Sequence, residues 1–261
     1  MKKLLSWSAI IIFTVILIVI IFGKKDNDQT SSKNETAKYV MDEKEKAVYD
    51  ALLNDDLASF SRGDESMLAD SLGIIASTST EVAKAYDENQ VAADQKFYKK
   101  EILISGKIQA INSGLGNEPY VVMSGSNQFL QPQIHFDKPD LQKISNLSKG
   151  QLAAFVCKGN GAIAGTPLFK NCALAEDYGL DKVQKKKIAL QDFLNGEKST
   201  DQFISGILFI SIAAAKKLPA TSDCYKDGKN CIKEIKNAVK KINEADAKNI
   251  RNELQKAGLK I

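Results

Sequence analysis

The chain contains 261 residues, of which 44% are hydrophobic and 26% charged, and its formal net charge at pH 7 is +4. This length suits one large domain or two small ones, and the composition is that of an ordinary globular protein. So small a net charge argues against a strongly basic nucleic-acid-binding protein and against a supercharged surface.

The N-terminal segment, MKKLLSWSAIIIFTVILIVIIFGKK, predicts a transmembrane anchor over residues 1–23. Residues 4–22 carry no charge, and about 20 apolar residues in a helix cross a hydrocarbon core of about 30 Å. A cleaved signal peptide is the alternative, but its apolar region is usually shorter and ends in a small-x-small site, which VIIFGKKD lacks. Residues 24–38 are polar, and we expect them to form a flexible stalk.

Residues 39–84 are predicted to be helical. One helix is expected over residues 37–60 and a second over residues 67–75, separated by the break SRGDES. The polar run STST then interrupts the helical pattern, and a third helix begins at Thr80 and continues to about Phe97.

Strand periodicity begins at Glu101. Apolar residues alternate in EILISGKIQAI, and Gly106 in the middle of this run predicts a bend. Further strands are predicted in YVVM, QPQIHF, QLAAFVCKG and TPLFKNCAL, with a helix beginning near Asp140 between the third and the fourth. GNGAIAG is expected to be the hairpin loop between the last two strands, because it lacks the spacing of a phosphate-binding loop.

This order of elements is that of the five-stranded OB barrel, whose first strand bends to pair in both halves of the sheet. We therefore predict an α+β fold with an OB-fold domain over residues 85–176. Residues 177–261 are predicted to form a helical C-terminal region. Within it FISGILFISIAAA is almost wholly apolar but too short to cross a bilayer, so we expect a buried helix.

The barrel region resembles the tRNA_anti-like family of bacterial OB-fold proteins, which are often described as envelope lipoproteins. The resemblance is carried by AYDENQVAADQKFYKKEILISGKIQAI, YVVM, LSKGQLAAFVCKG and FKNCAL, about a third of the chain. The positions that match the family pattern are Ala85, Tyr86, Asn89, Ala92, Ala93, Tyr98, Lys99, Gly106, Lys149, Gly150, Gln151, Cys157 and Cys172. This chain departs from the family in lacking a lipobox, in place of which it has the predicted anchor. The family name reflects similarity of fold to anticodon-binding domains, and tRNA binding is not carried over.

The four cysteines form two close pairs. Cys157 is predicted at the end of the fourth strand and Cys172 in the fifth; facing residues on neighbouring antiparallel strands lie at disulfide distance. Cys224 and Cys231 flank a turn. Two buried free thiols are the alternative for the first pair.

Zinc is not expected, because neither pair has Cys-x-x-Cys spacing and the chain has one histidine. Two disulfides indicate an oxidising compartment.

Charge alone does not orient the anchor, because Lys2 and Lys3 on one side balance Lys24 and Lys25 on the other. The paired cysteines favour a cytoplasmic N-terminus. We therefore expect a single-pass protein of the bacterial inner membrane, held through residues 4–22, with its bulk in the periplasm.

Candidate ligand contacts come from the second and third barrel strands and their loops, where OB folds often bind. The candidates are Tyr120, Met123, Phe129, His135 and Phe136. His135 is the only histidine, so Ser-His-Asp and Cys-His catalysis are disfavoured, and we expect neither an enzyme nor a cofactor or metal. Few lysines accompany the aromatic residues, so nucleic acid is not an expected partner.

The sequence therefore predicts a non-enzymatic, membrane-anchored OB module that recognises a protein, peptide or small envelope ligand. Two alternatives remain open. One is a protein of immunity or of mobile-element exclusion at the inner membrane, and the other is a single-stranded nucleic-acid-binding OB protein.

Overall fold

The computed structural model describes residues 38–137, 140–226 and 228–261. They divide into two compact units. One unit, here called the barrel unit, is Leu57–Asp181. The other, the helical unit, combines the described residues up to Asp56 with Lys182–Ile261.

The predicted anchor over residues 4–22 and almost all of the predicted stalk lie outside the described residues. Within the described ranges, no helix is both long and apolar enough to cross a membrane.

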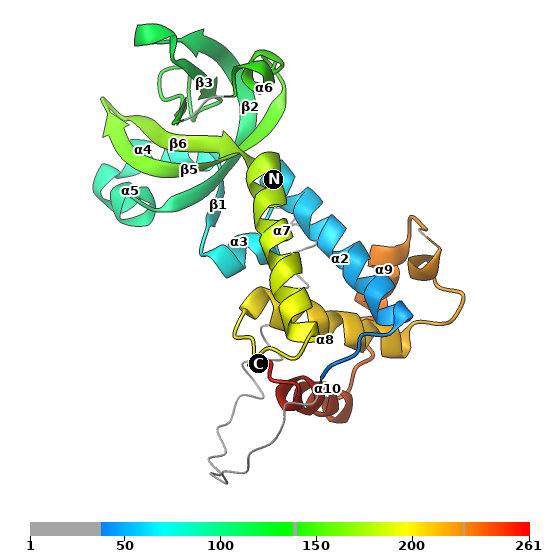
Figure 1. The fold of residues 1–261 in the computed structure, drawn as a ribbon. Coiled ribbons are helices and arrows are strands. Elements are labelled where there is room, and N and C mark those ends of the chain that lie inside the picture. The colour runs from blue at the N-terminus through cyan, green and yellow to red at the C-terminus, as the bar shows by residue number, and fades with distance from the viewer. Residues whose placement is uncertain (1–37, 138–139, 227) are drawn as a thin grey trace. The chain divides into compact units, whose positions relative to one another are not determined.

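Five strands of the barrel unit close into the predicted barrel (Figure 1). They are β2 (Glu101–Ser113), β3 (Pro119–Met123), β4 (Gln133–Phe136), β5 (Leu152–Ile163) and β6 (Thr166–Leu174). Their order is β2-β3-β4-β6-β5, and β5 pairs back onto β2 to close the sheet. The pairing of β4 with β6 is parallel, whereas the other four pairings in the barrel are antiparallel. This is the topology that the order of sequence elements predicted.

The first barrel strand changes partner shortly after Gly106, the residue at which the sequence predicts a bend. Residues 101–107 of β2 pair with β5, and residues 108–113 pair with β3, with an irregularity between Ile108 and Ala110. Gly106 lies at this change, where a Cβ atom would overlap the Ser79 side chain. Ser79 is held in place because its Oγ donates a hydrogen bond to the Ser124 carbonyl at 2.7 Å. The glycine is therefore needed for this close approach.

The barrel core combines inward-facing strand residues with side chains of two helices, α4 (Ser79–Glu88) and α5 (Gln90–Phe97). The disulfide between Cys157 and Cys172 lies in this core, with both residues buried. The buried core residues are Val82, Tyr86, Ala93, Phe97, Ile102, Ile104, Ile108, Val121, Met123, Ile134, Phe155, Cys157, Phe169 and Cys172.

The hairpin of β5 and β6 differs from the prediction. GNGAIAG is not a loop, because β5 continues to Ile163 and only Ala164 and Gly165 form the turn. Both turn residues have positive φ, 49° and 82°, as the tight hairpin turn of type I′ requires. Cys157 therefore lies in the middle of β5, not at its end. The glycine at position 159 allows close packing within the strand, because a Cβ there would overlap the Phe97 carbonyl.

The segment before the barrel is more divided than predicted. Helix α3 (Met67–Leu72) ends at Gly73, which has the left-handed conformation of a helix C-terminus. The chain then forms a strand, β1 (Ile75–Thr78), which pairs in parallel with β2. The prediction of a helix to residue 75 was therefore wrong. The helical pattern is interrupted before the third helix, as predicted, but the interruption is longer than STST and contains β1.

Side-chain caps explain the other boundaries. Thr78 and Glu81 form a reciprocal capping box that starts α4, and Asn89 caps α5, so the predicted third helix is two helices. Asp140 caps α6 (Leu141–Ser145), the helix predicted between the third and fourth barrel strands. A short 3₁₀ turn, η1 (Leu115–Asn117), connects β2 with β3.

Helices α2 (Glu43–Arg62) and α7 (Ala175–Leu194) each contribute residues to both units. The predicted start of the first helix at residue 37 was wrong. Asp42 accepts a hydrogen bond from the Glu45 backbone N–H at 2.8 Å, and the Glu45 carboxylate accepts one from Asp42 N–H at 3.1 Å. This reciprocal pair fixes the helix start near Asp42.

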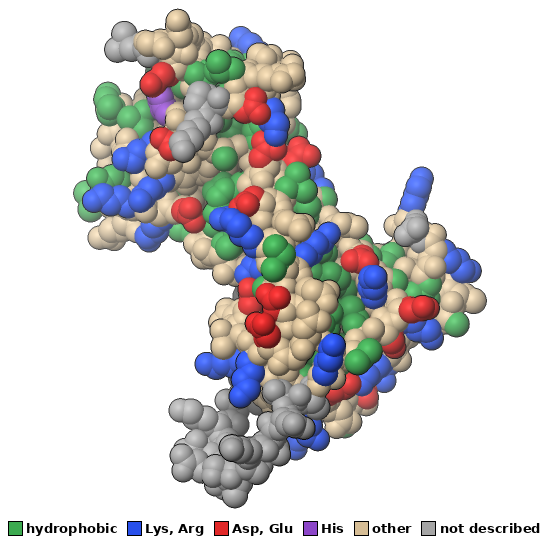
Figure 2. Space-filling view, in the orientation of Figure 1, with side chains coloured by type: hydrophobic (Ala, Val, Ile, Leu, Met, Phe, Trp, Pro, Cys, Tyr) green, Lys and Arg blue, Asp and Glu red, His purple; other side chains and the backbone are tan. Residues whose placement is uncertain are grey.

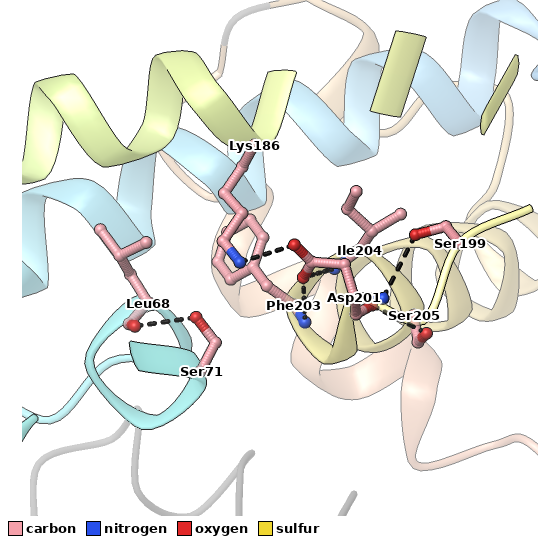
Figure 3. Close-up of polar contacts among 8 residues, drawn as sticks. All are labelled: Leu68, Ser71, Lys186, Ser199, Asp201, Phe203, Ile204 and Ser205. Atoms are coloured by element: carbon pink, nitrogen blue, oxygen red, sulfur yellow. Dashed lines mark hydrogen bonds and ion pairs between the residues drawn. The ribbon is translucent and has the colours of Figure 1, made fainter. Parts of the chain in front are cut away.

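The helical unit is built around α8 (Gln202–Lys217), which contains FISGILFISIAAA and is buried along most of its length, as predicted. Asp201 caps α8 by accepting hydrogen bonds from the backbone N–H groups of Phe203 and Ile204 (Figure 3). The same carboxylate accepts a hydrogen bond from Lys186 Nζ at 2.7 Å. The C-terminal helices are α9 (Cys231–Val239) and α10 (Glu244–Lys256). The second predicted disulfide joins Cys224, in the 3₁₀ turn η2 (Asp223–Tyr225), to Cys231 at the start of α9.

Candidate binding face on β3 and β4

The outer face of β3 and β4 carries a stacked pair of rings. Tyr120 and His135 are directly opposite each other across the two strands. Their ring centroids are 5.1 Å apart and their planes differ by 11°. Side chains alternate along a strand, so Val121 and Ile134, one residue along, point into the core while the two rings face outward.

Polar side chains lie beside this pair. His135 Nε2 is 3.3 Å from Gln133 Oε1, and Asn112 on β2 is opposite Tyr120 on its other side. Tyr120 is half-buried and His135 is exposed. Figure 2 shows the histidine, in purple, at the surface of the barrel unit with acidic side chains near it. A ligand placed here would meet two aromatic faces, a phenol hydroxyl and side-chain amides.

Partial burial lowers the pKa of the His135 imidazole, and the nearby Glu118 carboxylate opposes this effect. The imidazole is therefore neutral at neutral pH, so its stacking on Tyr120 is a contact between two neutral rings. The face offers stacking and hydrogen bonding, and the charge beside it from Glu118 is negative.

The structure brings together two of the five predicted contact residues. Met123 is fully buried in the barrel core and is not part of the outer face, because it follows the inward alternation of Val121. Phe136 is half-buried and packs edge-on against Phe155, with ring centroids 5.8 Å apart. Phe129 is exposed, but it lies in the loop after β3 and not in the strands of the stacked pair.

Gln133 and Asn112 are parts of the face that the sequence reasoning missed. The signal for Gln133 was present, because it lies two residues before His135 and so on the same side of β4. Asn112 could not be found in this way, since its place beside Tyr120 depends on the register between β2 and β3.

Within residues 38–137, 140–226 and 228–261, no three His, Cys, Asp or Glu side chains are grouped as a metal site requires. All four cysteines of the chain are in disulfides. The helical unit contains two concave sites, of about 530 and 420 Å³, that share Lys38, Tyr39 and Val40.

The sequence pattern of the tRNA_anti-like family matches residues 1–173. The chain belongs to the tRNA_anti-like family. The match contains all but the last residue of the stretch on which the sequence resemblance rested, and it also includes the residues before that stretch. No curated protein matches the chain.

One solved structure that is similar to this tRNA_anti-like chain is described as a "putative nucleic acid-binding lipoprotein" from Klebsiella pneumoniae subsp. pneumoniae MGH 78578. The two chains are 20% identical over a region that covers 38% of this chain and 90% of the other, with a TM-score of 0.32. So low a score supports no inference about function.

Proposed function

We propose that this tRNA_anti-like protein is a binding module without catalytic activity, which recognises a protein or peptide ligand of the cell envelope on the outer face of β3 and β4. The observation that carries this proposal is the stacked pair of Tyr120 and His135, flanked by Gln133 and Asn112. Aromatic rings with amide neighbours suit peptide groups and side chains, because the rings supply contact area and the amides supply hydrogen bonds.

The charge beside the face favours a peptide over a nucleic acid. His135 is neutral at neutral pH and Glu118 is negative, so neither attracts phosphate. Single-stranded nucleic acid is usually held by stacking together with lysine or arginine contacts to the backbone.

The proposed location is the periplasmic side of the bacterial inner membrane, with residues 4–22 as the anchor. The composition of that segment supports an anchor, and two disulfides support an oxidising compartment. A reporter enzyme that is active only in the periplasm, fused after Ile261, should therefore be active. Activity from a reporter that works only in the cytoplasm would contradict the proposed location.

The binding face is tested by photo-crosslinking in intact cells. A photoreactive phenylalanine derivative replaces Tyr120 in one strain and Leu141, an exposed residue of α6, in the control strain. We expect a covalent product from position 120 that is absent from position 141. Its partner, once purified, should bind the wild-type chain and bind the H135A and Q133A variants at least several-fold more weakly.

Two results would overturn the proposed function. One is a partner that binds the wild type, H135A and Q133A equally, because the contact then lies outside the face. The other is recovery of RNA or DNA as the product from position 120, which would establish the nucleic-acid alternative.

A further inference from the structure

Two stretches of the barrel unit contain no charged residue and meet at one end of the barrel. One is residues 124–134, which connect β3 to β4 and include the first two residues of β4. The other is residues 159–169, which form the end of the β5–β6 hairpin. Thr166 Oγ1 donates a hydrogen bond to the Phe129 carbonyl at 3.4 Å. A Cβ atom at Gly165 would lie 3.0 Å from Leu130 Cδ2. The two stretches therefore form one surface, here called the apolar tip: Phe129, Leu130, Ile163 and Ala164.

The apolar tip exposes large hydrophobic side chains. Phe129 is 76% exposed and Ile163 is 69% exposed. Single exposed apolar residues are common on proteins, but neighbouring ones in uncharged segments indicate a surface that is covered by a partner. In Figure 2, green side chains protrude at the outer edge of the barrel unit, where Figure 1 shows the end of the β5–β6 hairpin.

Lysines lie behind the apolar tip on the same hairpin and on the segment packed against it. Lys158 on β5 is directly opposite Lys170 on β6. The Lys99 N–H donates to the Gly159 carbonyl, and the Gly159 N–H donates to the Lys100 carbonyl. We use the name lysine collar for these four lysines together with Lys96, which lies in the last turn of α5.

The lysine collar is only partly offset by acidic groups. Glu101 is opposite Lys158, and the Asp94 carboxylate accepts a hydrogen bond from the Tyr86 hydroxyl at 2.9 Å. Like charges directly opposite each other in a sheet are destabilising. An anionic partner would reduce the electrostatic repulsion between Lys158 and Lys170.

The spacing between the two surfaces matches the layers of a membrane. Five residues along β5 separate Lys158 from Ile163, which at about 3.3 Å per residue is about 16 Å. Apolar groups that enter a membrane surface reach about 5–10 Å into the boundary between headgroups and acyl chains. Flexible lysine side chains behind them would then meet the lipid phosphates. Tyr98 lies between the two levels, 3.8 Å from the Cβ position of Gly161, and tyrosine is enriched at membrane interfaces.

We propose that the apolar tip inserts into the surface of a membrane that contains anionic lipids, with the lysine collar against the lipid headgroups. A membrane surface accounts for both features at once, because it presents an apolar layer beneath a negatively charged one. This contact is separate from the proposed binding face on β3 and β4, and it would fix the distance of that face from the membrane.

The test uses a single tryptophan as a depth reporter in the full-length chain. The chain has one tryptophan, Trp7, which is removed by W7F. F129W then places an indole at the apolar tip, and L152W places one at the opposite end of β5 as a matched control. Leu152 is 78% exposed, close to the value for Phe129. Each variant is reconstituted with vesicles of phosphatidylcholine and phosphatidylglycerol whose acyl chains are brominated or not.

We expect the fluorescence of F129W to shift to shorter wavelength and to be quenched by the brominated lipid, whereas L152W shows neither change. The quenching of F129W should fall in vesicles of phosphatidylcholine alone and on addition of salt, since headgroup attraction is screened. The substitutions K158Q and K170Q, made together in the F129W chain, should reduce the quenching as much as the removal of phosphatidylglycerol does. Circular dichroism of each variant confirms that the fold is retained.

Three results would overturn the proposal. Absence of quenching in F129W shows that the apolar tip does not reach the acyl chains. Equal quenching of F129W and L152W shows that no one end of the barrel faces the membrane. Shielding of the F129W indole only after addition of soluble envelope proteins, without lipid quenching, assigns the surface to a protein partner.

Discussion

Because His135 is the only histidine, a single imidazole resonance in a proton NMR spectrum reports directly on the candidate binding face. Burial lowers its pKa, so we expect a midpoint below about 6.5, the value of an unperturbed histidine. The substitution E118Q removes the opposing carboxylate and should lower the midpoint further. A midpoint at or above the unperturbed value would contradict the neutral stacked pair.

The same shift has a consequence for stability. Folding lowers the pKa of this base, so the unfolded chain binds the proton more readily. The favourable contribution of the neutral imidazole is complete above about pH 6.5 and is lost as the pH falls from there through the folded pKa. An H135Q variant should lack this part of the pH dependence, which is measured by urea unfolding at several pH values.

Gly159 is a strand residue at which a single added methyl group should disturb the barrel. The position has ordinary φ, but a Cβ would overlap the Phe97 carbonyl. Both backbone groups of Gly159 are hydrogen-bonded, to Lys99 and Lys100, so the strand cannot move away. We expect G159A to destabilise the barrel unit by about 1–3 kcal/mol or more, in the range of overpacked cores, as measured by urea unfolding.

Gly114 provides the matched control for that substitution. Its Cβ position is 3.3 Å from the nearest atom, the Glu118 carbonyl, and its φ is also ordinary. G114A should therefore cost much less than G159A. Equal effects of the two substitutions would show that the close approach of Gly159 to α5 is unimportant for stability.

At the scale of elements, the hairpin of β5 and β6 is held by the Cys157–Cys172 disulfide, which spans 15 residues of sequence. In the chain-entropy account a loop of this size contributes about 3 kcal/mol. We expect C157A together with C172A to lower the free energy of unfolding by about 2–4 kcal/mol, measured by chemical denaturation. Adding reductant to this double variant should leave the barrel unit unchanged. A loss below about 0.5 kcal/mol, no more than a typical surface substitution causes, would contradict a structural role for the bond.

The sequence predicted the barrel strands well because their apolar residues alternate and turn residues separate them. The helix between the third and fourth barrel strands was predicted from its capping residue, Asp140. The prediction failed where glycine can indicate either a loop or close packing within a strand. Glycines at 159, 161 and 165 indicate a loop, yet only Gly165 lies in the turn. Gly159 allows close packing against α5, and Gly161 has a positive φ of 76° within the strand. Strand β1 was missed because four residues give too little periodicity, and its stability depends on pairing with β2.

The candidate face was predictable only in part for a similar reason. Alternation along β4 places His135 and Gln133 on the same side. The pairing of Tyr120 with His135, and the inward direction of Met123, depend on which residues face each other across β3 and β4. Register of this kind is a property of the folded sheet that one strand's sequence does not contain.

At the scale of the whole molecule, each unit has its own buried core and its own disulfide. The barrel core contains Cys157 and Cys172, and the buried helix α8 is the centre of the helical unit. We expect C224A together with C231A to increase amide hydrogen exchange mainly in η2, α8 and α9, and to leave the barrel strands protected. The matched double variant C157A and C172A should show the reverse pattern. Equal acceleration in both units after either change would show that the molecule opens as one cooperative unit.

The burial of Cys157 and Cys172 sets an order for the maturation of the protein. Their side chains are 1% and 5% exposed, so a thiol oxidase cannot reach them once the barrel has closed. The bond therefore has to form before the barrel closes around the two cysteines. Once sealed, it is equally out of reach of cellular reductants, so a molecule oxidised during assembly keeps its bond for as long as it stays folded.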